Sequence, residues 1–373
     1  MRILLVDPTL VYPGEGAKLT AFKAIPGVTL EALSGERHRD EARQAQMPRM
    51  AQWHGIPLHL GKIIGKFPNR TWMLGGLRDC LKKQPDVILA YSDWNHWLTL
   101  QIAIAKTLIS PRSKLIFQAW ENQPPTWRRH PQPNSALYVL DSVVEKVVFR
   151  LADGAAARNA EAQRVLVRRG FRKPIRLIPW GVDMGFFHPR EPEHTEEFTV
   201  GYVGRLVREK GVADLLMALQ GLEGVKALII GGGPEAKKLR ELADQRDINA
   251  EFVAAVPQET LPEWYSRMDL LVLPSRTTRK WAEQFGRVLV EAMAMGVPVI
   301  GSDSGAIPWV IGDRDLIFPE GDSPSLRNLI LKLKSDEILR NMKAKIGQMR
   351  AREFFTWEIH ARATVEFCRE IYS

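Results

Sequence analysis

Short apolar runs alternate along this chain with longer stretches in which apolar residues recur at helical spacing. In the first half the runs predict strands at Ile3–Val6, Val87–Tyr91, Lys114–Gln118 and Arg176–Ile178, with helices between them at Trp97–Leu108 and Ser135–Leu151. Such alternation is typical of a parallel sheet that is covered by helices on both faces. The first half is therefore expected to form an α/β domain.

The same alternation restarts after residue 197. The expected strands are Thr199–Val203, Lys226–Ile230, Ala250–Val253, Leu270–Leu273 and Val297–Ile300, and the expected helices are Val212–Leu219, Glu235–Gln245, Leu261–Ser266 and Gly286–Met295. A chain of 373 residues is long enough for two such domains, each with its own core. The pattern thus predicts two doubly wound, Rossmann-like domains.

Composition marks the boundary between them. Residues 179–189 are rich in Gly and Pro, and residues 190–197 are mostly charged. We expect an N-terminal domain over residues 1–180, a linker over 181–197 and a C-terminal domain over 198–353.

The net charge of +9 is unevenly distributed. Residues 1–182 contain 27 Lys and Arg against 14 Asp and Glu, and the remainder contains 25 against 29. A basic half is consistent with a solvated surface, an anionic membrane or a phosphorylated substrate. No nucleic-acid-binding motif accompanies the charge, so no nucleic acid partner is expected.

No apolar segment approaches the length of a membrane span, and the first apolar run is too short for a signal peptide. A cytoplasmic protein is expected, with peripheral association at the inner face of the membrane as an option. Cys80 and Cys368 have no Cys or His neighbour at metal-ligand spacing. They are expected to be reduced packing residues, and no metal or cofactor is expected.

Two carboxylates eight residues apart lie near a predicted loop-to-helix junction. If the helix begins near Gly286, Glu291 lies on it while Glu283 is held in the preceding loop, and both reach the same cleft. Carboxylates placed in this way can accept hydrogen bonds from a polyhydroxylated ligand. The alternative is an ordinary helix with two solvated glutamates.

A basic turn follows the predicted strand Thr199–Val203. Gly204 allows a close approach of backbone to a ligand, and Arg205 and Lys210 place two cations beside a helix N-terminus, which favours anions. This arrangement suits a diphosphate. Arg208, in the same turn, is expected to be solvated.

The motifs together identify a family. Arg205 and Lys210, the glycine turn Gly231-Gly232-Gly233-Pro234, the strand end Pro274-Ser275 and Glu283-x7-Glu291 with its Ala-Met-Ala-x-Gly-x-Pro-Val continuation follow one another in order. This order resembles the nucleotide-sugar site of the retaining glycosyltransferases of family 4, the glycosyl transferases group 1. The resemblance implies the GT-B fold, in which two Rossmann-like domains face each other across a cleft.

The resemblance also implies roles for single residues. Arg205 and Lys210 would hold the donor diphosphate, Glu291 the ribose hydroxyls and Glu283 the transferred sugar. The remaining donor contacts would come from backbone groups at Gly204, Gly232, Val253, Phe285 and Gly286. Residues 302–309 depart from the usual Gly-Gly-x-Pro-Glu, with Ala306 and Trp309 in the second and fifth places, so local reshaping is expected.

The N-terminal domain matches the family less closely. Its loop after the first strand contains Gly14 and Gly16, whose amides would face a phosphate, but it lacks the usual adjacent glycines. Lys18 nearby is expected to be solvated. The last residues, about 354–373, resemble the C-terminal helix that returns to the first domain.

The largest departure follows the strand Lys114–Gln118. Many relatives have a histidine there, whereas this chain has Trp120 and Glu121. Glu121 is one candidate for a catalytic role and His96 is another, with a structural role as the alternative for each. The tryptophans near these positions either form a sugar-stacking platform or pack in the core; they are Trp94, Trp97, Trp120 and Trp127.

The resemblance predicts a retaining transfer of a hexose-type sugar from a UDP- or GDP-linked donor to an acceptor hydroxyl. The acceptor would be a saccharide, a lipid-linked molecule or a phosphorylated one, within cell-envelope glycan synthesis. Two alternatives remain, since fold alone does not fix chemistry: a nucleotide-sugar epimerase or hydrolase, and a non-catalytic binding subunit.

Overall fold

The computed structural model describes residues 1–10, 15–36, 52–53, 55–66, 70–122, 136–190, 197–279 and 281–373. These residues form two compact units. Unit 1 comprises Met1–Gly181 and Trp357–Ser373, and unit 2 comprises Val182–Thr356. The boundary lies at the start of the expected linker, where Val182 and Thr356 pair in a β-bridge within unit 2.

Unit 1 is built on one sheet with the strand order β3-β4-β2-β1-β6-β7-β8-β9, in which β5 also pairs with β4. All pairs are parallel except those of β3 and β5 with β4. Its strands are β1 (Arg2–Val6), β2 (Thr29–Gly35), β3 (Gln52–Trp53), β4 (Ile56–Lys66), β5 (Arg70–Leu74), β6 (Val87–Ala90), β7 (Lys114–Ala119), β8 (Gly154–Ala157) and β9 (Ile175–Leu177).

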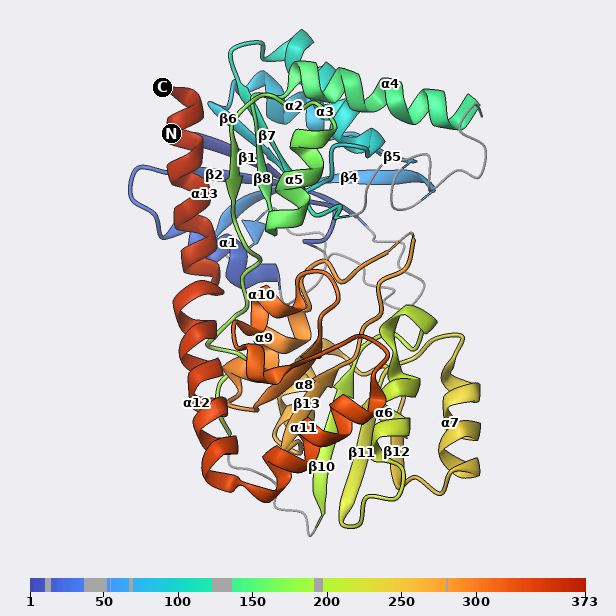
Figure 1. Cartoon of the computed structure of the whole chain (residues 1–373). Coiled ribbons are helices and arrows are strands. Elements are labelled where there is room, and N and C mark those ends of the chain that lie inside the picture. The colour runs from blue at the N-terminus through green and yellow to red at the C-terminus, as the bar shows by residue number, and fades with distance from the viewer. Residues whose placement is uncertain are drawn as a thin grey trace. The chain divides into compact units, whose positions relative to one another are not determined.

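Helices cover both faces of this sheet (Figure 1). One buried cluster joins apolar side chains of α2, α3, α4 and α5 to the central strands, while α1 packs against α13. The helices are α1 (Gly16–Lys23), α2 (Leu77–Lys82), α3 (Trp97–Ile109), α4 (Ala136–Leu151), α5 (Ala160–Arg168) and α13 (Trp357–Tyr372).

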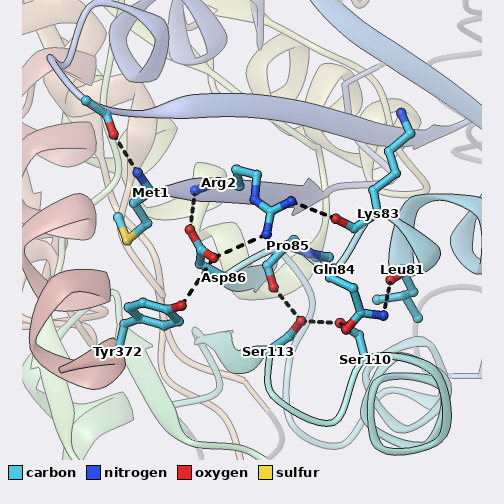
Figure 2. Close-up of polar contacts among 11 residues, drawn as sticks. Met1, Arg2, Leu81, Lys83, Gln84, Pro85, Asp86, Ser110, Ser113 and Tyr372 are labelled. Carbon is cyan, nitrogen blue, oxygen red and sulfur yellow. Dashed lines mark hydrogen bonds and ion pairs between the residues drawn. The ribbon is translucent and has the colours of Figure 1, made fainter.

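Polar contacts fix the edge of the unit 1 sheet at which β1 and β6 begin (Figure 2). Asp86, just before β6, accepts the amide of Arg2 at 2.7 Å and the hydroxyl of Tyr372 at 3.3 Å. The guanidinium of Arg2 donates to the backbone carbonyl of Lys83 at 3.0 Å. These contacts tie α13 and the end of α2 to the sheet.

Unit 2 contains a fully parallel sheet with the strand order β12-β11-β10-β13-β14-β15. Its strands are β10 (Phe198–Val203), β11 (Val225–Ile230), β12 (Ala250–Val253), β13 (Leu270–Leu273), β14 (Val299–Ser302) and β15 (Ile317–Phe318). Its helices are α6 (Val212–Leu219), α7 (Ala236–Gln245), α8 (Leu261–Tyr265), α9 (Arg287–Ala294), α10 (Ile307–Ile311), α11 (Ser323–Ser335) and α12 (Glu337–Phe354), with 3₁₀ turns at Arg208–Lys210, Gln258–Thr260 and Arg314–Leu316.

Both sheets reverse their strand order beside a central strand. In unit 1 the reversal lies between β1 and β6, and in unit 2 it lies between β10 and β13. Open α/β sheets bind ligands at the carboxyl ends of the strands at such a point. The loops after β1, β6, β10 and β13 are therefore the places to look for a site.

The prediction of two doubly wound α/β domains is confirmed, and most predicted elements agree within two residues. One strand begins two residues late, at Val299 instead of Val297. The reason is that the amide of Val297 donates to the carbonyl of Ala292 at 2.9 Å and so closes the end of α9. Among the described residues, no helix is both long and apolar enough to span a bilayer.

Candidate donor and acceptor sites

The turn after β10 lies at the reversal point of unit 2. Gly204 follows the strand, and a 3₁₀ turn at Arg208–Lys210 leads into α6. The hydroxyl of Tyr202 donates to the carbonyl of Arg205 at 2.8 Å. Burial, with a smaller contribution from the Glu283 carboxylate, raises the pKa of Tyr202 well above its ordinary value, so the phenol stays a donor. This bond fixes the backbone that carries the two predicted cations.

Lys210 and Glu283 are brought together as an ion pair. Nζ of Lys210 lies 2.6 Å from Oε2 of Glu283 and 4.8 Å from the ring centroid of Trp281. Arg205 is exposed, and no ion pair of its side chain is found within the described part of the chain. The predicted solvent exposure of Arg208 is also observed.

The carboxylate of Glu283 is held in place by its surroundings. Oε2 accepts the hydroxyl of Ser275 at 2.9 Å, and Ser275 is itself fully buried after β13. The backbone carbonyl of Glu283 accepts the amide of Ala306 at 2.9 Å. Gly305 has φ +55°, and a Cβ there would lie 2.2 Å from that carbonyl, so only glycine permits this approach. The loop around Glu283 is thus rigidly built.

Helix α9 begins at Arg287, next to Gly286, where the sequence predicted its start. Gly286 precedes it with φ +76°, a left-handed conformation that favours glycine. The side chain of Phe285 is buried against Trp309 and Phe355, at centroid distances of 6.4 and 5.6 Å. Its expected contribution to donor binding is therefore confined to its backbone. Trp309, which departs from the family pattern, fills an aromatic cluster instead of presenting a carboxylate.

Glu291 lies on α9 with 1% of its surface exposed. Oε2 accepts the hydroxyl of Tyr265 at 2.8 Å, and Oε1 lies 3.0 Å from Nε of Arg287. A carboxylate has about four acceptor positions, so these two contacts leave room for a further donor such as a ribose hydroxyl. The alternative of two solvated glutamates is excluded, because Glu283 and Glu291 are both buried and paired.

The glycine turn after β11 is tied to the basic turn. The amide of Leu206 donates to the carbonyl of Gly232 at 2.8 Å, and the amide of Gly204 donates to the carbonyl of Ile230 at 2.9 Å. Gly232 is exposed, with open space where a Cβ would lie. Val253 ends the neighbouring strand β12 and is half-buried. Backbone at all these positions follows the carboxyl ends of adjacent strands.

In unit 1 the loop after β1 leads to a group of buried charged side chains. Lys18 is fully buried, where it pairs with Asp7 and, at 2.8 Å, with Glu15. Burial lowers its pKa, but the carboxylates of Asp7 and then Glu15 outweigh it, and the net pKa is raised. The expectation that Lys18 is solvated is wrong. Gly16 begins α1 and is buried, whereas Gly14 lies outside the described residues.

Aromatic rings and Arg158 line the carboxyl ends of β7 and β8. The guanidinium carbon of Arg158 lies 4.4 Å from the ring of Trp120 and 3.9 Å from that of Trp180. Burial lowers the pKa of Arg158 to about 10, so it remains charged at neutral pH. Sequence patterns gave no sign of this residue, because a single arginine after a small-residue strand matches no motif.

Glu121 and His96 are both enclosed within this region. The amides of Trp120 and Glu121 donate to Oδ2 of Asp93 at 3.3 and 3.0 Å, which fixes the loop after β7. Nδ1 of His96 lies 3.1 Å from the hydroxyl of Ser92, and its ring meets Trp120 edge-on at 5.6 Å. These contacts fix the orientation of the His96 ring, and a catalytic role for it stays a prediction. Glu121 is 9% exposed, and its role stays a prediction.

The predicted tryptophan platform is only partly supported. Trp94 is 1% exposed and packs against Phe149 at 5.7 Å, so it belongs to the core. Trp97 packs edge-on against Trp72 at 5.7 Å. Trp127 lies outside the described residues. Of the three rings that the structure describes, Trp120 is the one that contacts Arg158 and His96 at the carboxyl edge of the sheet.

Comparison with known proteins agrees with this geometry. The family model described as Glycosyl transferases group 1 matches residues 183–350, a range that includes the residues predicted to bind a donor in unit 2. The D-inositol 3-phosphate glycosyltransferase of Corynebacterium jeikeium is 30% identical over 223 residues, which cover 53% of this chain and 52% of that protein. The 2-deoxystreptamine N-acetyl-D-glucosaminyltransferase of Streptomyces fradiae is 24% identical over 345 residues, which cover 83% of this chain and 76% of that protein.

Solved structures show the same fold over the whole chain. The structure of Anabaena HepE in complex with UDP is similar with a TM-score of 0.75 and 20% identity, over 99% of this chain and 100% of that one. Sucrose-phosphate synthase from Thermosynechococcus elongatus is similar with a TM-score of 0.68 and 19% identity, over 100% and 99%. This chain spans about half the length of the first curated relative. Its residues 183–350 are similar to the glycosyl transferases group 1 family, and its two Rossmann-like units have the GT-B fold.

Proposed function

We propose that this protein is a retaining glycosyltransferase that moves a hexose-type sugar from a UDP- or GDP-linked donor to an acceptor hydroxyl. The observation that carries the proposal is the Lys210–Glu283 pair, 2.6 Å apart at the reversal point of unit 2. In this proposal Lys210 is the cation for a departing diphosphate, and Glu283 is the carboxylate for sugar hydroxyls. Two curated relatives support the substrate class: one is named as a D-inositol 3-phosphate glycosyltransferase and the other as a GDP-mannose-dependent mannosyltransferase.

The chemistry follows from charge and position. Departure of the nucleoside diphosphate leaves negative charge on its phosphate oxygens, which the fixed cations Arg205 and Lys210 would stabilise in the transition state. Glu283, held by Ser275, would orient the sugar so that the acceptor hydroxyl approaches the face that the leaving group occupied. We propose that these residues stabilise the leaving group without a metal ion and that the transfer requires no cofactor.

The experiment measures nucleotide release from UDP- and GDP-sugars with and without saccharide or lipid-linked acceptors. Acceptor-dependent release, with the anomeric configuration of the donor kept in the product, is the expected result. Release that needs no acceptor would point to a hydrolase or epimerase. Tight nucleotide binding without turnover on any acceptor would point to a binding subunit.

We also propose that unit 1 associates peripherally with the inner, anionic face of a membrane, where the acceptor is lipid-linked and cell-envelope glycans are made. The support is helix α4, on which Val139 and Val143 are exposed and Lys146 and Arg150 follow at helical spacing on the same stripe. Co-sedimentation with anionic and neutral vesicles tests this. Val139→Ser with Val143→Ser should reduce binding to anionic vesicles, and unchanged binding would contradict the proposal.

A further inference from the structure

Three side chains with metal-ligand chemistry come together in unit 1, on the face of the sheet that α2 covers. Glu31 comes from β2, His59 from β4 and Cys80 from α2, and one ligand atom of each lies within 4.8 Å of the other two. They are far apart in sequence, so the spacing around Cys80 gave no sign of them. None of the three belongs to the carboxyl-edge loops described above.

The pairing of β2 with β4 and the packing of α2 bring these three residues together. Strand β2 pairs with β4 in parallel, with Leu33 opposite His59. Glu31 lies two residues from Leu33 and hence on the same face, where Leu33 and Cys80 share one apolar cluster. The side chains of Glu31 and His59 are 28% and 27% exposed, and Cys80 is buried. The group is therefore open to solvent on one side and enclosed on the other.

A cation already occupies this place. Nζ of Lys83 lies 2.8 Å from Oε2 of Glu31 and 3.5 Å from Nε2 of His59. Only the backbone carbonyl of Lys83 is engaged with Arg2, and its side chain extends away from that contact (Figure 2). This side chain is 50% exposed, so the ammonium can leave without any movement of the backbone.

We propose that Glu31, His59 and Cys80 form a binding site for a divalent transition metal of the Zn²⁺ class, in which the ion replaces the ammonium of Lys83. Zinc is bound by this combination of thiolate, imidazole and carboxylate, and three protein ligands leave one position for water. The ion would join β2, β4 and α2, and it would stabilise unit 1. The proposal does not rest on the proposed sugar transfer.

Binding would release one proton. A thiol binds a metal ion as the thiolate, so the proton of the Cys80 thiol must leave when the ion binds. The ion forms a bond to Sγ as the S–H bond breaks, and the proton passes to solvent. The apparent affinity should accordingly rise with pH.

The experiment is a titration of the full chain with Co²⁺ after treatment with a chelator. We expect one ion per chain and a sulfur-to-cobalt charge-transfer band. Cys80→Ser should abolish the band, whereas the matched variant of the other buried cysteine, Cys368→Ser, should keep it. His59→Gln removes one of the three ligands from a partly exposed position and should weaken binding at least about 100-fold. No band in the wild-type chain, or a band that survives Cys80→Ser, would overturn the proposal.

A second variant tests the exchange of one cation for another. Lys83→Met keeps the aliphatic stem and removes the competing charge, so Co²⁺ and Zn²⁺ should bind about tenfold more tightly. Zn²⁺ should also raise the melting temperature of the wild-type chain, because it binds the folded state only. Equal or weaker metal binding by Lys83→Met would contradict the placement of the ion at the ammonium position.

Discussion

Cationic side chains lie at the carboxyl edges of both sheets, but they differ in solvent exposure. In unit 2 Arg205 is exposed, and Lys210 is 20% exposed and paired with Glu283. In unit 1 Lys18 is fully buried with Asp7 and Glu15, and Arg158 is half-buried between the rings of Trp120 and Trp180. An exposed cation keeps most of its capacity to bind a ligand, whereas a buried one must be neutralised by the protein itself. This difference favours anion binding at unit 2, as proposed, and a preformed polar framework in unit 1.

The largest effect is expected from the exposed cations. Arg205→Ala should lower kcat about 10²–10³-fold, since it removes one group that stabilises the departing diphosphate. Arg208→Ala, a matched change of an exposed arginine in the same turn, should leave kcat nearly unchanged. Steady-state kinetics with one donor and acceptor pair measures both. Similar losses in the two variants would contradict the assignment of Arg205.

The stability of unit 1 should decrease at low pH because His360 is buried in its neutral form. Burial lowers the pKa of His360 to about 3 from an ordinary 6.5, with Nδ1 beside the carbonyl of Pro179 at 2.7 Å and Nε2 beside the hydroxyl of Tyr91 at 2.7 Å. A neutral ring can donate to the first and accept from the second. Because the folded state excludes the proton, its stability is complete above pH 6.5 and falls as the pH drops towards 3.

The expected loss is about 2 kcal/mol at pH 5, from about 1.4 kcal/mol per pH unit below 6.5. Urea unfolding of the wild-type chain and of His360→Asn at pH 7.5 and pH 5 measures it. The variant should be less stable at pH 7.5 but lose less stability on acidification. If the two proteins showed the same pH dependence, protonation of His360 would not be the cause of the loss of stability at low pH.

A smaller effect is expected from the support of Glu283. Ser275→Ala removes one hydrogen bond to its carboxylate and should lower kcat/KM about tenfold, because bonds to charged groups contribute roughly 1.5–3 kcal/mol. Thr at the same position keeps a hydroxyl and should restore part of the activity. A variant Ser275→Ala with normal kinetics would mean that Lys210 alone positions Glu283.

The smallest effect is expected in unit 1. Glu121→Gln should lower kcat/KM for the acceptor about fivefold, the order of one neutral hydrogen bond, without changing nucleotide affinity. Calorimetric titration with UDP and GDP, alongside acceptor kinetics, separates the two. A changed nucleotide affinity would contradict the division of roles between the units.

Sequence patterns predicted unit 2 better than unit 1 for a physical reason. In the proposed function, residues around Arg205, Glu283 and Glu291 contact the donor through charge and backbone geometry, and such contacts require particular residue types at particular spacing. The burial of Lys18 depends on Asp7 and on rings from distant parts of the chain, so no local pattern indicates it. Strand β4 was missed because Gly61, Lys62 and Gly65 interrupt its apolar run.

The most direct measurement compares the affinities of a nucleoside diphosphate and its parent nucleoside, for both uridine and guanosine, by calorimetric titration. For the base that binds, we expect the diphosphate to bind about 100-fold more tightly than the nucleoside, as two charge-assisted contacts would give. That difference should largely disappear in the double variant Arg205→Ala with Lys210→Met. An undiminished difference in the double variant would contradict the assignment of these cations to the diphosphate.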